Sequence, residues 1–171
     1  MKVVIVGGGL VGLTLGGLLA RRGADALVLE RMEPGDYVRR GFMLGHHGFG
    51  ALEELGLLDD IRRRGRPIGL QPDGREAAIA VEVGNLLRAL ADAAPVRYAA
   101  AVTDLVRDGD RVTGVVLDDG AEALPADLVV ACDGFSSRVR GMAGIVADIV
   151  PMAEGKIEWM SPVPCEQSFA M

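Results

Sequence analysis

Cysteine and histidine are scarce in this chain of 171 residues, which has two of each. Cys132 and Cys165 match no zinc-ligand spacing and are too few for a disulfide framework, so we expect a reducing, cytoplasmic environment. His46 and His47 are adjacent, whereas two metal ligands on one helical face lie about four residues apart. The sequence therefore predicts no metal site.

Positive charge is also in deficit, with 18 Lys and Arg against 24 Asp and Glu. The formal net charge of -6 argues against the phosphate backbone of a nucleic acid or an anionic membrane as the main partner. The apolar N-terminal stretch is expected to be neither a signal peptide nor a membrane span. Glycines interrupt it, and Arg21 and Arg22 close it after too few residues.

The first thirty residues have the pattern of a βαβ unit. Residues 3–6 are a run of β-branched side chains, typical of a parallel strand that is buried on both faces. After three glycines, residues 10–22 have an apolar side suited to a helix, which Gly23 would end. Residues 26–30 then predict a second buried strand, parallel to the first.

The remaining pattern continues the alternation of strands and helices. We expect an α/β, Rossmann-like fold with a central parallel sheet and a small antiparallel β-meander. Its further elements are a loop over 31–45, a helix over 50–65 broken near Gly56, two strands around the turn at 72–74, a helix over 85–94, strands over 97–100, 102–107 and 112–117, and a central parallel strand over 127–134 that ends in Asp-Gly.

The glycines at the first strand–helix junction form a G-x-G-x-x-G motif of Gly7, Gly9 and Gly12. Gly7 permits a tight turn, Gly9 lets a diphosphate approach the backbone, and Gly12 lets the helix pack against the strands. The helix start, at Leu10 and Val11, then presents free N–H groups and a partial positive charge to the phosphates. The alternative is that these glycines only shape a turn.

A carboxylate ends the second predicted strand. Glu30 stands at about the distance from the glycines that a ribose-binding acid needs. A carboxylate there repels a 2′-phosphate, so Glu30 favours FAD or NAD over NADP. The alternative is a solvated strand end.

A second motif, D-G-x-x-S-x-V-R, is matched at residues 133–140. With the first motif and Glu30, it makes the chain resemble the FAD-dependent aromatic hydroxylases of the para-hydroxybenzoate hydroxylase type, the group A flavin monooxygenases. Residues 39–61 also resemble the family's segment after the second strand. The resemblance implies an FAD-binding domain over residues 1–144, followed at 145–171 by a remnant or the start of a substrate-domain sheet.

Further cofactor-binding residues are implied by this resemblance: Arg31, Arg40, Gly41, Val102, Asp133 and Gly134. The backbone at Val102 would meet the adenine. Asp133 would accept a hydrogen bond from a ribityl or ribose hydroxyl, and Gly134 would permit close approach. For Ser137 and Arg140 two interpretations stay open, namely direct ligand contact, or a helix cap and a structural ion pair.

The sequence departs from the family in three places. Val83 stands where family members usually carry an arginine that touches the flavin phosphates, and Arg88 lies too far along the helix to replace it. The family's later G-D motif is absent. We expect the substrate sheet to be truncated, although residues 155–164, with Trp159, faintly resemble its first strand.

We therefore consider three functions, and none has an assigned catalytic side chain. The first is an FAD-dependent monooxygenase that hydroxylates an aromatic or related small molecule with NADPH or NADH and oxygen. The second is a non-catalytic module that binds FAD or ADP. The third is an NAD-dependent dehydrogenase, against which the Asp-Gly motif and the lack of a catalytic His or Lys–Tyr pair argue. A truncated substrate domain would expose the FAD face, so a homodimer or a partner is expected to cover it.

Overall fold

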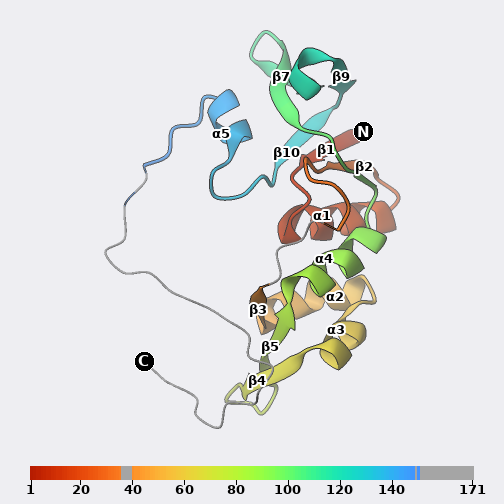
Figure 1. Ribbon diagram of the computed structural model, residues 1–171, viewed down its shortest axis with the longest axis vertical. Helices are drawn as coiled ribbons and strands as arrows, with labels where there is room; N and C mark the ends of the chain where they lie inside the picture. Colours follow the sequence, from red (N-terminus) through yellow and green to blue (C-terminus); the bar gives the residue numbers. More distant parts are fainter. Residues whose placement is uncertain (36–39, 149, 151–171) are drawn as a thin grey trace.

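The computed structural model describes residues 1–35, 40–148 and 150. Figure 1 shows three sheets that follow one another along the longest axis, with a parallel sheet between two antiparallel ones. Among the described residues, no helix has the length and apolar character needed to cross a membrane.

The parallel sheet is formed by β1 (Lys2–Val6), β2 (Asp25–Leu29), β6 (Val96–Arg97) and β10 (Leu128–Ala131), in the order β10-β1-β2-β6. All three pairings are parallel, which confirms the predicted α/β fold. Two predicted details are wrong. The strand expected over 97–100 ends at Arg97, because Ala99 has a φ of 50° and leaves the extended region. The strand expected at the centre, β10, lies at the edge of the described sheet.

Helix α1 (Leu10–Arg21) connects β1 to β2 and ends before Gly23, whose φ of 75° suits the position after a helix. Strand β1 is buried on both faces, as its β-branched run predicts. Val3 and Ile5 pack in the cluster that includes α1, whereas Val4 and Val6 pack in a second cluster on the other face.

That other face is covered by the antiparallel meander of β7 (Val102–Asp108), β8 (Arg111–Leu117) and β9 (Glu122–Pro125). A short 3₁₀ helix, Asp118–Gly120, joins β8 to β9. The meander confirms the antiparallel unit expected from the sequence. Its last strand is tied to the parallel sheet by Arg97, which donates two hydrogen bonds to Glu122 at 2.8 and 2.6 Å.

The third sheet has the order β3-β5-β4 and consists of β3 (Gly41–Gly45), β4 (Arg66–Leu70) and β5 (Glu76–Glu82). Strand β3 corrects the expectation of a loop over 31–45. This segment of five residues is too short and too rich in glycine to show the alternating pattern of a strand. Its pairing with β5 holds it extended. The β4–β5 hairpin around the turn at 72–74 is as predicted.

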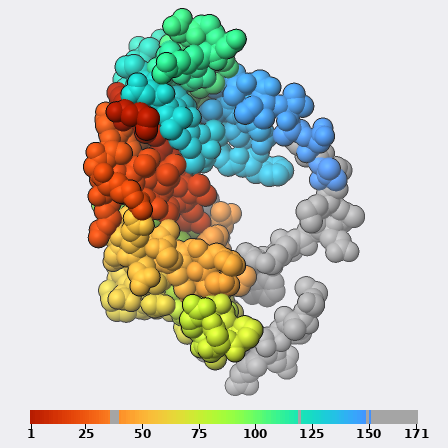
Figure 2. Space-filling model, turned by 180° about the vertical axis from the view of Figure 1, so that it is seen from behind, coloured from red at the N-terminus to blue at the C-terminus, as the bar shows by residue number. Residues whose placement is uncertain are grey.

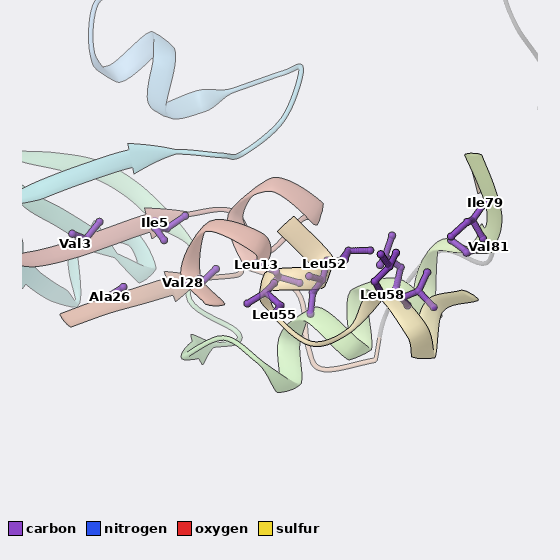
Figure 3. Packing of buried hydrophobic residues seen from close by; sticks show 13 residues of the cluster. Val3, Ile5, Leu13, Ala26, Val28, Leu52, Leu55, Leu58, Ile79 and Val81 are labelled. Atoms are coloured by element: carbon purple, nitrogen blue, oxygen red, sulfur yellow. The ribbon is translucent and has the colours of Figure 1, made fainter. Parts of the chain in front are cut away.

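One hydrophobic core joins the parallel sheet to this third sheet. Helices α2 (Phe49–Glu54) and α3 (Leu58–Arg64), separated near Gly56 as predicted, lie between them together with α4 (Val83–Asp92). Figure 3 shows the cluster running from Ile5 through Leu13 and Leu55 to Ile79. The G-x-G-x-x-G motif at the start of α1 is therefore supported by a packed hydrophobic core.

After β10 the chain turns into the short helix α5 (Arg138–Met142). Figure 2 shows the surface hollowed between the blue residues around α5 and the red and orange residues of the first part of the chain. Residues 145–148 and 150 form no helix or strand. The rest of the predicted substrate-sheet remnant, with Trp159, lies outside the described residues, as does Cys165.

Candidate dinucleotide-binding site

A cavity of about 350 Å³ lies at the carboxyl ends of β1, β2 and β10, beside the start of β7. Open α/β sheets bind their ligands at this end of the strands. Seven residues expected from the sequence to bind the cofactor line it: Gly7, Gly9, Glu30, Arg31, Val102, Asp133 and Gly134.

The three motif glycines have different surroundings. A Cβ on Gly7, whose φ is 108°, would overlap the carbonyl oxygen of Cys132. A Cβ on Gly12 would overlap the carbonyl oxygen of Gly7. A Cβ on Gly9 would have no neighbour within 4 Å. Gly7 and Gly12 are therefore required by the packing of the protein, whereas the space beside Gly9 is left for a ligand.

The start of α1 is suited to an anion. Its N-cap residue, Gly9, provides no side-chain cap, and its first turn contains no acidic residue. The first intrahelical bond runs from Leu13 N to Gly9 O at 3.0 Å, so the N–H groups of Leu10, Val11 and Gly12 precede it. These three residues, which were expected to bind the cofactor, are not among those that line the cavity, and they would contribute only backbone N–H groups.

Glu30 lies against the glycine turn. Its Oε2 accepts a hydrogen bond from Gly8 N at 2.7 Å, and its Oε1 accepts one from Met32 N at 2.9 Å. A Cβ on Gly8 would lie 2.7 Å from Glu30 Cβ. Sequence reasoning missed Gly8, although the run of three glycines marks it as unusual. The carboxylate is thus held in the cavity that the ribose of a dinucleotide would enter.

Asp133 fixes the segment after β10, which forms the cavity wall opposite Glu30. Its carboxylate accepts hydrogen bonds from Ser137 Oγ at 2.6 Å, Arg138 N at 2.7 Å and Val139 N at 3.1 Å. Partial burial raises the pKa of Asp133, but these hydrogen bonds to its charged form lower it by more, so the net pKa lies below the ordinary value. Asp133 is therefore ionised at neutral pH and fixes the start of α5.

Of the two interpretations of Ser137, the structure shows the helix cap, and direct ligand contact stays a prediction. Ser137 is the N-cap of α5, and its Oγ accepts a hydrogen bond from Arg140 N at 3.0 Å. The Arg140 guanidinium donates to Phe135 O at 3.3 Å, and no carboxylate of the described residues pairs with it. Both contacts hold the loop after β10 in place.

Two predicted residues lie away from this cavity. Gly41 begins β3, and Arg40 precedes it; neither lines the cavity. The carbonyl oxygen of Arg40 accepts a hydrogen bond from Val83 N at 3.0 Å, which ties the start of α4 to β3. Val83 itself is only 3% exposed, so the position at which the family resemblance implies an arginine is part of the packed interior here.

Several lining residues were not expected from the sequence as ligand contacts: Val6, Leu29, Met32, Ala100, Ala101, Cys132, Ser136, Arg138 and Val139. Ser136 and Arg138 occupy variable positions of the second motif, so no pattern marked them. Burial, and then the charge of Asp133, raises the pKa of the Cys132 thiol. No group of three His, Cys, Asp or Glu within the described ranges suits a metal ion.

The chain is similar to flavin-dependent enzymes. The family pattern described as FAD binding domain matches residues 1–167. A 6-methylpretetramide 4-monooxygenase from Streptomyces rimosus is 33% identical, over 92% of this chain and 44% of that protein. A 3-hydroxybenzoate 6-hydroxylase from Klebsiella oxytoca is 28% identical, over 82% of this chain and 42% of that protein.

The fold is also found among solved structures. The Diels-Alderase PyrE3 of pyrroindomycin biosynthesis superposes with a TM-score of 0.74 at 29% identity, over 84% of this chain and 34% of that one. This chain thus spans less than half the length of each of these three proteins. The residues that line the cavity fit the ADP part of FAD, with an open glycine, an uncapped helix start and a fixed carboxylate. The chain belongs to the FAD-binding domain family of the group A flavin monooxygenases and corresponds to only part of its longer members.

Proposed function

We propose that this chain provides the FAD-binding part of a monooxygenase that hydroxylates an aromatic or related small molecule with NADPH or NADH and oxygen. The observation that carries the proposal is the single cavity in which both sequence motifs meet, with Gly7 and Gly9 on one side and Asp133 and Gly134 on the other. Similarity to hydroxylases and monooxygenases supports the reaction class.

The residues divide the binding task between them. The backbone at Gly9 and the start of α1 would bind the diphosphate, since both are open and uncapped. Glu30 would accept hydrogen bonds from the ribose hydroxyls. The start of β7 at Val102 would meet the adenine. When bound, a flavin reduced by NADPH or NADH supplies the chemistry that transfers one atom of molecular oxygen to the substrate.

The absorbance spectrum of the protein as purified, followed by release and identification of the bound cofactor, tests this proposal. Protein without flavin is then titrated with FAD, and the melting temperature is followed. We expect FAD to be bound and to raise the melting temperature. Substrate-stimulated oxidation of NADPH or NADH would then support the reaction. A melting temperature that neither FAD nor NAD changes would contradict dinucleotide binding altogether.

The burial of Val83 favours a second candidate, a module that binds FAD or ADP without turnover. The family's arginine at this position would touch the flavin phosphates, and a buried valine provides no such contact. The two candidates differ in NADPH or NADH oxidation, which the FAD-loaded module would not show with any aromatic compound. The third function considered from the sequence, an NAD-dependent dehydrogenase, gains no support from a family defined by FAD.

A further inference from the structure

We propose that Arg138 binds the diphosphate of the dinucleotide and supplies the positive charge that Val83 does not. The inference rests on the proposed function, because it requires a dinucleotide in the cavity. Arg138 lines the same cavity as Gly7 and Gly9, the two glycines of the diphosphate-binding turn.

The backbone of Arg138 is held firmly. It is the first residue of α5, and its N–H donates to Asp133 Oδ2 at 2.7 Å. The Ser137 hydroxyl donates to the other oxygen of the same carboxylate at 2.6 Å. The backbone of Arg138 is therefore preorganised at the cavity wall. This limits the conformational entropy that is lost when the guanidinium binds an anion.

The negative charges that line the cavity favour a cation beside the diphosphate. Glu30 and Asp133 both line it, so a diphosphate enters a space that already contains two carboxyl side chains. Two arginines also line it, Arg31 and Arg138. A guanidinium can form two parallel hydrogen bonds to a phosphate, which makes arginine well suited to this task.

Position separates the two arginines. Arg31 follows Glu30 at the end of β2, on the side of the ribose-binding acid. Arg138 belongs to the wall formed by the segment after β10, and this wall adjoins the turn, since a Cβ on Gly7 would lie 2.9 Å from Asp133 Cα. This arrangement favours Arg138 as the partner of the diphosphate and Arg31 as a neighbour of the adenosine.

The guanidinium of Arg138 is available. Within residues 1–35, 40–148 and 150 it has no hydrogen bond or ion pair, whereas that of Arg140, two residues further along α5, donates to Phe135 O. Binding a phosphate would therefore break no contact within this part of the chain. Arg111, an exposed arginine at the start of β8, does not line the dinucleotide cavity and is the matched control.

The experiment is a calorimetric titration of wild type, Arg138→Gln and Arg111→Gln with FAD, ADP and adenosine. We expect Arg138→Gln to weaken FAD and ADP about ten- to a hundred-fold, as the loss of a charged hydrogen bond would. Adenosine, which has no phosphate, should keep its affinity, and the salt dependence of ADP binding should become weaker. Arg111→Gln should bind all three ligands as wild type does. The melting temperature of each variant shows that it is folded.

Three outcomes would overturn the inference, and they differ in what they leave intact. If wild type binds FAD, and Arg138→Gln binds ADP as tightly as wild type does, Arg138 is a solvated cation and the proposed function stands. If adenosine loses as much affinity as ADP, the substitution acts through the shape of the cavity. If wild type binds neither FAD nor ADP, the proposed function fails together with the inference.

Discussion

Glu30 and Gly8 are joined by a hydrogen bond of 2.7 Å from Gly8 N to the Oε2 of the carboxylate. The second strand of the βαβ unit thereby fixes the glycine turn that follows the first strand. The other carboxylate oxygen accepts from Met32 N, so Glu30 also holds the chain as it leaves β2. One side chain thus shapes the cavity and presents charge to the ligand.

Replacement of Glu30 by glutamine should weaken ADP binding by roughly ten-fold, because the amide NH₂ would face one of two backbone N–H donors and disturb the turn. The same change should reduce the preference for ADP over adenosine 2′,5′-bisphosphate, since the negative charge that repels a 2′-phosphate is removed. Calorimetric titration with both nucleotides measures the two effects. Glu33→Gln, at an exposed position outside the cavity, is the control. Unchanged preference in Glu30→Gln would show that Glu30 does not face the ribose.

Alanine substitutions at Gly9 and Gly12 should separate binding from stability. Gly9 has a φ of -78° and open space around it, so Gly9→Ala should lower the free energy of unfolding by no more than about 1 kcal/mol, the cost of alanine at an N-cap. Its methyl group would occupy the approach of the diphosphate, and ADP binding should fall. Gly12→Ala would overlap the carbonyl oxygen of Gly7 and should cost about 1–3 kcal/mol. Urea denaturation and ADP titration measure both properties. If Gly9→Ala lowers the stability but leaves ADP binding unchanged, the ligand does not approach Gly9.

The stability that Asp133 contributes should depend on pH. Its pKa is lowered by folding, so the contribution is complete above the ordinary value of 3.8 and is lost as the pH falls through the lower pKa of the folded state. Asp133→Asn should therefore be less stable than wild type by about 1 kcal/mol near neutral pH, as expected for a weakened helix cap. The difference should shrink in acid. Urea denaturation from neutral to acidic pH measures it, with Asp110→Asn in the exposed β7–β8 turn as control. A difference that stays constant with pH would contradict a role for the ionised carboxylate.

The parts of the fold that could be predicted are those with local signals. The β-branched run before Gly7 indicates a buried parallel strand, and the glycine spacing indicates the turn and the helix after it. Glu30 and Asp133 could be selected because each ends such a strand. The carboxyl ends of parallel strands meet at one edge, so the two residues share a cavity although they are far apart in sequence.

The rest depends on contacts that no local pattern encodes. Strand β3 exists because it pairs with β5, and β10 lies at an edge because of the order in which the strands assemble. The entry of Arg138 into the cavity follows from the way Asp133 sets the start of α5. Coverage of the FAD face by a second copy or a partner stays a prediction, which light scattering of the purified chain would test.

The paired hydrogen bonds between Arg97 and Glu122 should stabilise the junction of the parallel sheet and the meander without affecting the ligand. The hydrogen bonds from Arg97 lower the pKa of Glu122, so the pair is charged at neutral pH. Arg97→Gln and Glu122→Gln should each lower the melting temperature, and the double variant should be little worse than either, because the second change removes a partner already lost. The effect should decrease in high salt, since both side chains are partly exposed. Neither residue lines the dinucleotide cavity, so ADP affinity should stay at the wild-type level. If the two losses add fully, or if ADP binding weakens with them, the pair does not act as an independent tie between the sheets.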